Sequence, residues 1–255
     1  MSRLQGKNVF ITGASSGIGE SCARHFAQAG SNLILAARRK ERLAGLKSEL
    51  ESKHAGIKIA IYELDVRQRA KVHEVTAQFE DNVDILINNA GLVIGLDKLE
   101  DITEEALDTM MDTNVKGLVH VTQAVLPGMR QRNKGHIINI GSVAGQQPYA
   151  NGSIYCATKA AVASISRALM AETVNTNIRV SEINPGLVET EFSVVRFRGD
   201  KDKADNVYKG LTPLNGDDIA EMIVFIASRP DHVNIAEMLV FPTHQAGATI
   251  VHRDT

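Results

Sequence analysis

The sequence predicts a single-domain α/β fold, with a doubly wound parallel sheet of about seven strands flanked by helices. Short apolar runs alternate with amphipathic stretches along almost the whole chain, as in repeated strand–helix–strand units. Most of the runs are continuously apolar, which is typical of strands that helices cover on both faces. No linker or break in composition appears, so we expect one domain over residues 1–255.

The apolar runs predict strands over residues 9–11, 32–36, 57–64, 85–87, 136–140, 178–183 and 238–241. The periodic stretches between them predict helices over 17–29, 39–53, 68–80, 103–132, 153–176 and 216–228, the fourth divided into two. Residues 187–215 form an irregular insertion that carries a run of charged side chains. An insertion of this length within a compact domain predicts a lid.

Composition excludes several classes of protein. The chain has 28 basic and 30 acidic residues, a net charge of −2, which argues against a nucleic-acid partner. No apolar stretch approaches the length of a membrane span, and the N-terminal segment has no signal-peptide core. The only two cysteines, Cys22 and Cys156, are far apart in the sequence and form no C-x-x-C pair. So few thiols indicate a reducing compartment, and we expect a cytoplasmic protein. No His and Cys cluster has metal-ligand spacing, so no metal site is predicted.

A glycine-rich turn follows the first expected strand and precedes a helix. Its glycines Gly13, Gly17 and Gly19 allow positive φ angles, close approach of backbone amides to phosphate oxygens, and close packing of helix and sheet. The helix N-terminus adds partial positive charge. The alternative is a strand-to-helix turn without a ligand; the position after the first strand favours a dinucleotide site. The residues predicted to contact its pyrophosphate are Gly13, Ser15, Ser16, Gly17, Ile18 and Gly19.

The end of the second expected strand carries Arg38 and Arg39 in place of a carboxylate. A carboxylate there would bind the ribose 2′-hydroxyl of NAD, whereas a guanidinium fits the 2′-phosphate of NADP. The two arginines therefore favour NADP(H) over NAD(H). The alternative is that they only begin a solvated helix.

Three side chains are candidates for chemistry on an oxygen atom. Ser142 follows the fifth expected strand, where ligands of open α/β sheets bind. Tyr155 and Lys159 lie four residues apart on the next helix and so share one face. A Tyr-x-x-x-Lys pair in isolation more often lies on a solvated face, and its position near Ser142 favours a common pocket.

These motifs form one ordered set: the turn at 12–19, Asn88-Asn89-Ala90-Gly91, Asn114, Ser142, Tyr155-Cys156-Ala157-Thr158-Lys159 and Asn184-Pro185-Gly186. In this order and spacing the chain resembles the short-chain dehydrogenase/reductase family over nearly its whole length. The segments 186–199 and 241–246 further resemble the NADP-dependent 3-hydroxy acid dehydrogenases, a group that includes serine and L-allo-threonine dehydrogenases. The resemblance implies a Rossmann fold, a homotetramer, NADP as cofactor and a small hydroxy acid or carbonyl substrate.

The resemblance also implies roles for individual residues. Tyr155 would be the acid/base, and the Lys159 cation would lower the pKa of this tyrosine. Lys159 would also bind the nicotinamide ribose, and Asn114 would hold a water that links Lys159 to solvent; the alternative for Asn114 is a helix amide that satisfies backbone groups. Further cofactor contacts would come from Asp65, Val66, Asn88, Ala90, Gly91, Pro185, Gly186, Val188 and Thr190.

A hydroxy acid substrate requires a cation for its carboxylate. Arg196 and Arg198 lie in the insertion, and Arg196 is the preferred candidate; the alternative is a surface arginine in a charged loop. Gln147 and Phe192 are predicted to line the same pocket, with Ser142 hydrogen-bonded to the substrate oxygen. Two other functions stay open: a carbonyl, 3-oxoacyl or hydroxysteroid oxidoreductase of the same fold, and a non-catalytic NADP-binding regulator.

Overall fold

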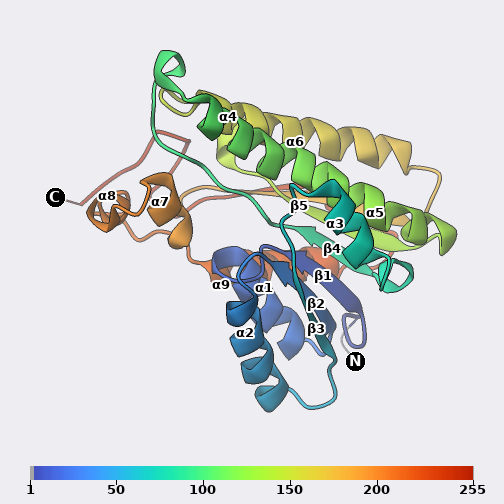
Figure 1. Ribbon diagram of the computed structural model, residues 1–255. Helices are drawn as coiled ribbons and strands as arrows, with labels where there is room; N and C mark the ends of the chain where they lie inside the picture. Colours follow the sequence, from blue (N-terminus) through green and yellow to red (C-terminus); the bar gives the residue numbers. More distant parts are fainter. Residues whose placement is uncertain (1–2, 255) are drawn as a thin grey trace.

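The computed structural model describes residues 3–254, and its central layer is a parallel sheet of seven strands (Figure 1). The strand order is β3-β2-β1-β4-β5-β6-β7. Because the order reverses between β1 and β4, a crevice forms outside the carboxyl ends of these strands. The strands are β1 (Asn8–Thr12), β2 (Asn32–Ala37), β3 (Ile59–Glu63), β4 (Ile85–Asn88), β5 (Gly135–Ile140), β6 (Ile178–Pro185) and β7 (Glu237–Val240).

Helices cover both faces of the sheet (Figure 1). On one face, α1 (Gly17–Gln28), α2 (Lys40–Lys53) and α9 (Gly216–Ala227) pack in an apolar cluster that includes Phe26 and Leu35. On the other, α3 (Arg69–Thr76), α5 (Leu118–Gln131) and α6 (Ser153–Glu172) pack around Phe10 and Leu86. Neighbouring residues of one strand thus enter opposite clusters, which explains the continuously apolar strands of the sequence.

The predicted fold class is confirmed, and the elements differ from the expected ones mainly at their ends. The helix expected over 68–80 ends earlier, with a separate 3₁₀ turn at Glu80–Asn82. The stretch 103–132 consists of α4 (Glu104–Met111), a π-helical turn at Asp112–Gly117 and α5. A π turn carries one extra residue per turn. The helix axis therefore continues from α4 into α5, while the side of the helix that is buried changes at the π turn. Hydrophobic periodicity predicts the helices and does not reveal this turn.

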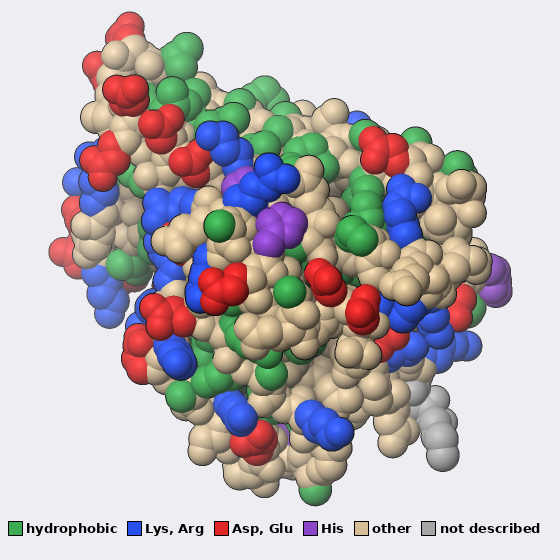
Figure 2. Space-filling view, turned by 45° about the vertical axis from the view of Figure 1, so that its right-hand side comes forward, with side chains coloured by type: hydrophobic (Ala, Val, Ile, Leu, Met, Phe, Trp, Pro, Cys, Tyr) green, Lys and Arg blue, Asp and Glu red, His purple; other side chains and the backbone are tan. Residues whose placement is uncertain are grey.

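The insertion at 187–215 contains two short helices, α7 (Glu191–Arg196) and α8 (Lys201–Asn206). They lie beyond the carboxyl ends of the strands, near the C-terminal segment (Figure 1). Acidic and basic side chains are interspersed on the face drawn in Figure 2, in keeping with the small net charge. Within residues 3–254, no helix has the length and apolar character needed to cross a membrane.

Candidate active site

A cleft of about 640 Å³ opens at the carboxyl ends of the strands. Its lining comes from the segments that follow β1 to β6, from α6, from the insertion and from the C-terminal segment. It brings together most of the predicted site residues, namely Gly13, Ser15, Ser16, Gly17, Ile18, Arg38, Arg39, Asp65, Val66, Ala90, Gly91, Ser142, Tyr155, Lys159, Pro185, Gly186, Val188, Thr190, Phe192 and Arg196. Four predicted residues are absent from the described lining: Gly19, Asn88, Asn114 and Gln147.

The glycine-rich turn owes its shape to backbone conformation and close packing. Gly13 and Gly17 have φ angles of 66° and 55°, in the left-handed region that favours glycine. Gly19 packs beneath the turn, because a Cβ there would lie 2.5 Å from both Gly13 O and Asn89 Nδ2. Asn89 donates hydrogen bonds to the carbonyls of Thr12 and Gly13 at 3.0 and 3.2 Å. Gly19 thus supports the turn from below instead of facing the cleft, and Asn89 is a supporting residue that sequence reasoning missed.

A cationic group lies beside the turn. The Arg39 guanidinium donates to Ser15 Oγ at 3.2 Å and to Ser16 Oγ at 2.8 Å. It also pairs with Glu191 at the start of α7, as does Arg42, at 2.9 and 2.6 Å. The hydrogen bond from Arg42 is the largest of the effects that lower the pKa of Glu191. Glu191 thus joins the insertion to the arginine side of the cleft, a role that nothing in the sequence pattern marked.

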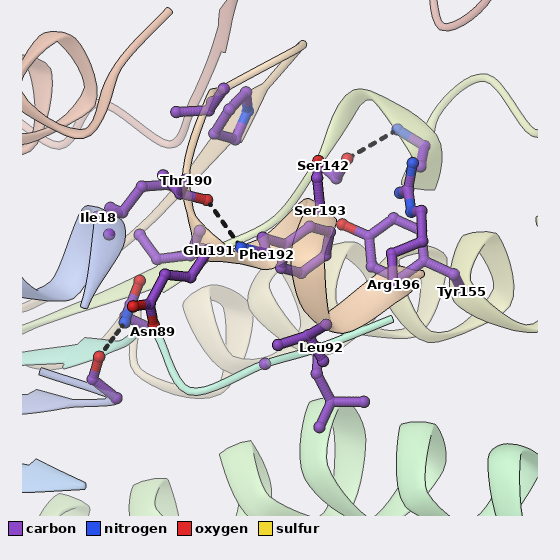
Figure 3. Close-up of a pocket in the computed structure, with 18 of the residues that line it drawn as sticks. Ile18, Asn89, Leu92, Ser142, Tyr155, Thr190, Glu191, Phe192, Ser193 and Arg196 are labelled. Carbon is purple, nitrogen blue, oxygen red and sulfur yellow. Dashed lines mark hydrogen bonds between the residues drawn. The ribbon is translucent and has the colours of Figure 1, made fainter. Parts of the chain in front are cut away.

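Ser142, Tyr155 and Lys159 converge in the cleft as the sequence predicts. Asn184 Oδ1 accepts a hydrogen bond from the Ser142 amide at 2.9 Å, which fixes the backbone after β5. Tyr155 lies in the first turn of α6, and its hydroxyl points toward Ser142 (Figure 3). Lys159 follows one turn later, and its Nζ donates to Ile140 O at 2.7 Å. All three side chains are buried, so a charge on Tyr155 or Lys159 is little screened by water.

Burial dominates the titration of this group. It raises the pKa of Tyr155 to about 12, against a hydrogen bond with Ser142 and the charge of Arg196. It lowers the pKa of Lys159 to about 8, against the charge of Glu182. In the unliganded site the pKa of Tyr155 therefore lies above its usual range and not below it, because burial outweighs the nearby positive charge. Lys159 Nζ is bound to the Ile140 carbonyl and lies 5.9 Å from the centre of the tyrosine ring.

The side chains of Asn88, Asn114 and Gln147 form hydrogen bonds within the protein and do not line the described cleft. The Asn88 amide is buried and donates to Thr122 Oγ1 and Asn139 Oδ1, because this strand end points its side chain under α5. Asn114 lies in the π turn, where its side chain accepts from Leu92 N and donates to Leu92 O and Thr158 Oγ1. The Gln147 side chain accepts from the amide of Ala248 and so holds the C-terminal segment.

Arg196 lies over the acid/base candidate (Figure 3). Its guanidinium carbon is 5.9 Å from the ring centre of Tyr155 and 5.7 Å from that of Phe192. One terminal nitrogen donates to the Tyr149 hydroxyl at 3.4 Å. The Nε atom is buried and has no hydrogen-bond partner among residues 3–254. By contrast, Arg198 is exposed and pairs with Asp97 at 3.5 Å. Tyr149 is a further lining residue that the sequence analysis did not single out.

This fold, with a serine, a tyrosine and a lysine meeting at a glycine-rich cleft, defines a nucleotide-dependent oxidoreductase of the short-chain type. Residues 7–200 match the family model described as short chain dehydrogenase, and the chain belongs to that family. It is 50% identical, over 99% of both chains, to the NADP-dependent 3-hydroxy acid dehydrogenase of Schizosaccharomyces pombe. It is 43% identical to sulfoacetaldehyde reductase 2 of Chromohalobacter salexigens, over 96% of this chain and 98% of that one.

A solved structure agrees with these relatives. The closed form of a serine dehydrogenase complexed with NADP⁺ superposes with a TM-score of 0.90 at 46% identity, covering 97% of this chain and 100% of that one. The similarity thus extends over the whole cleft, including the insertion.

Replacing Gly19 with alanine tests the packing beneath the glycine-rich turn. Because the obstructing atoms include the Gly13 carbonyl, which the turn holds in place, we expect G19A to lower the free energy of unfolding by about 1–3 kcal/mol. Gly45 is the matched control, since a Cβ there meets nothing within 4 Å; G45A should raise stability by about 0.5–1 kcal/mol through helix propensity. Urea denaturation measures both, and equal stability of G19A and the wild type would contradict the packing argument.

Proposed function

We propose that this chain is an NADP-dependent dehydrogenase that oxidises the 3-hydroxyl group of short 3-hydroxy acids, including serine and allo-threonine. The observation that carries the substrate class is the partly buried Arg196 cation beside Tyr155, whose Nε atom is buried without a hydrogen-bond partner in the described part of the chain. A buried donor without a partner is costly, and a guanidinium matches a carboxylate in charge and shape. A substrate carboxylate at Arg196 would bring a hydroxyl group on a neighbouring carbon toward Tyr155 and Ser142.

The names of the relatives agree with an anionic substrate. One is called a 3-hydroxy acid dehydrogenase, another a sulfoacetaldehyde reductase, and a structural neighbour a serine dehydrogenase. Each of these names describes a small molecule with a carboxylate or sulfonate near a hydroxyl or carbonyl group. A steroid or a neutral alcohol has no anionic group that would pair with the Arg196 guanidinium.

The residues of the cleft fit NADP. The amides of the turn at Gly13–Gly17 would hold the pyrophosphate, and Arg39 with Ser15 and Ser16 would hold the 2′-phosphate, since these hydroxyls and the guanidinium already share hydrogen bonds. Arg38 lines the same side. The adenine would lie against Asp65 and Val66, the ribose along Ala90 and Gly91, and the nicotinamide near Pro185, Gly186, Val188 and Thr190, all of which line the cleft.

Tyr155 and Ser142 would interact with the oxygen atom of the substrate. During oxidation Tyr155 Oη takes the hydroxyl proton while the C–H bond gives up a hydride, and Ser142 donates a hydrogen bond to the oxygen. Bound NADP⁺ supplies the hydride acceptor and a positive charge near the phenol. That charge, with Arg196 and Lys159, opposes the effect of burial and favours the phenolate.

In this proposal the insertion at 187–215 acts as a lid over the cleft. It contributes Phe192 and Arg196 to the cleft, and its backbone is tied to the loop after β4 by a hydrogen bond from Gly95 N to Arg196 O at 2.8 Å. Closure over the substrate would exclude water from the hydride transfer. We further propose a homotetramer located in the cytoplasm, which light scattering and cell fractionation would test.

Turnover of a hydroxy acid is the direct test of the function. We expect NADP⁺ reduction, followed at 340 nm, with L-serine, L-allo-threonine or another 3-hydroxy acid. Tyr155→Phe should lower kcat by roughly 10²–10⁴-fold, because the proton acceptor is lost, and leave NADPH affinity intact. Turnover in the wild type also separates an enzyme from a non-catalytic NADP-binding regulator, and full activity in Y155F would refute the mechanism.

Arg196→Ala tests the substrate class. We expect kcat/KM for 3-hydroxy acids to fall on the order of 100-fold, as for the loss of one partner of a buried charge pair, mostly through KM. A neutral secondary alcohol should lose far less. Arg198→Ala removes the same charge from the same insertion at an exposed position and should change neither value much. Equal losses for acids and neutral alcohols in R196A would favour a general carbonyl or hydroxysteroid oxidoreductase.

Arg39→Ala tests the cofactor. The affinity for NADPH should fall roughly 10- to 100-fold, as expected for lost hydrogen bonds to a charged group, while NADH affinity stays unchanged. Lys40→Ala removes a neighbouring charge that does not line the described cleft and serves as the control. Titration of NADPH fluorescence measures each Kd, and a wild-type preference for NADH would overturn the NADP assignment.

A further inference from the structure

A row of polar side chains crosses the sheet behind the site. Asn88, Asn139, Glu182 and Glu237 are successive register partners on β4, β5, β6 and β7. The Asn88 amide donates to Asn139, and the Asn139 amide donates to Ser166 of α6. The row therefore lies under α6, the helix that carries Tyr155 and Lys159, and leads from the core to the edge strand.

Glu182 is the buried carboxyl group of this row, and the mechanism above does not use it. It is 2% exposed, and its Oε1 atom has no hydrogen-bond partner in the described chain. Burial of a charged group without compensation is unfavourable, so a nearby cation must offset the cost when the group is ionised.

The position of Glu182 is close to the backbone that leads into the catalytic serine. A Cβ on Gly141 would lie 2.4 Å from Glu182 Oε1, so the carboxyl group rests against the Gly141 backbone. Lys159 Nζ donates to the carbonyl of the preceding residue, Ile140. The carboxyl group and the ammonium thus meet neighbouring peptide units just before Ser142.

Charged and polar side chains from each surrounding element affect the pKa of Glu182. Lys159 and Arg167 come from α6, Glu237 from β7, and the Asn184 amide from β6 itself. Arg167, Asn184 and Gln146 all contact Glu237, so the outer carboxylate has its own partners. Burial, together with Glu237, raises the pKa of Glu182 to about 7, and burial lowers that of Lys159 to about 8. Between these values both groups are charged.

We propose that Glu182 is a positioning residue that acts through Lys159: its carboxylate keeps the buried ammonium charged, and the ammonium in turn favours the phenolate of Tyr155. The first step concerns this pair of side chains alone. The second step rests on the proposed function, since it matters only where Tyr155 serves as the base.

The effect follows from the coupled protonation of Tyr155 and Lys159. One form combines phenolate with ammonium and can accept the proton of the substrate. A competing form with the same number of protons combines phenol with neutral amine and cannot. The Glu182 carboxylate stabilises the ammonium and so selects the first form. Without it, Lys159 loses its proton at lower pH and the competent fraction falls.

The test titrates Lys159 directly, in protein that carries lysine labelled with ¹³C at Cε. The variant Lys159→Arg identifies the resonance by its disappearance. We expect Glu182→Gln to lower the midpoint of this resonance by about one pH unit, as for removal of a nearby opposite charge. Glu182→Asp, which keeps the charge, should stay close to the wild type. Glu237→Gln is the matched control, since it removes a charge from the same row that is not among the charges acting on Lys159, and should not lower the midpoint.

Kinetics then follow the consequence for the reaction. The highest kcat/KM of E182Q for hydroxy acid oxidation should fall roughly tenfold, the equivalent of one pH unit of charge interaction, with unchanged NADPH affinity and thermal unfolding. A loss of rate without a shift of the Lys159 midpoint would indicate a purely structural role and overturn the proposal. An unchanged midpoint in E182Q overturns it whatever the substrate, whereas a shifted midpoint in a chain that oxidises no hydroxy acid contradicts the proposed function alone.

Discussion

The hydrogen bond from Lys159 Nζ to the carbonyl of Ile140 is the contact on which the geometry of the site depends. It ties the first half of α6 to the end of β5, so that Tyr155, one turn earlier on the helix, faces Ser142 just after the strand. A second link acts in the same place: Thr158 Oγ1 donates to Tyr155 O and accepts from the Asn114 amide. The π turn of the preceding helix is thereby joined to the catalytic helix. Sheet, helix and π turn together fix three side chains without help from a ligand.

The same burial that fixes these groups sets their electrostatics. A phenol and an amine taken out of water both favour their neutral forms, and the pKa values of about 12 and about 8 express this. Catalysis by a phenolate therefore needs positive charge gathered around Tyr155 from several directions. Arg196 supplies it from the insertion, Lys159 from α6, and the bound cofactor from the cleft. A substrate carboxylate at Arg196 would in turn offset part of its charge, so in the proposed mechanism the base strength of Tyr155 would depend on what occupies the cleft.

The fold and the centre of the site could be predicted from the sequence because both depend on local patterns. Apolar runs at regular intervals require the doubly wound sheet, and Tyr155 and Lys159 share a helix face by their spacing alone. The sequence does not reveal side-chain directions that depend on tertiary packing. Asn88 turns under α5 because it is the last residue of a buried strand, and Gln147 is drawn to Ala248, 101 residues away in the sequence. The Asn89 side chain packs against Gly19, which the glycine pattern alone does not reveal. No periodicity or motif carries such information, nor does it reveal that four strands align Asn88, Asn139, Glu182 and Glu237.

In the proposed mechanism, the site divides into a part that performs the reaction and a part that selects the substrate. Ser142 follows β5, and Tyr155 and Lys159 lie on α6. The core holds both elements, and the three side chains would act on any oxygen placed between them. Arg196 and Phe192 stand on α7, a short helix with few buried residues, anchored to the rest by Glu191 and by the bond from Gly95. Such a segment can change its side chains at little cost in stability, because the core does not depend on it. Relatives named for a hydroxy acid and for a sulfonated aldehyde are consistent with this arrangement, since one cation near Tyr155 would serve either anion while the hydride chemistry stays the same.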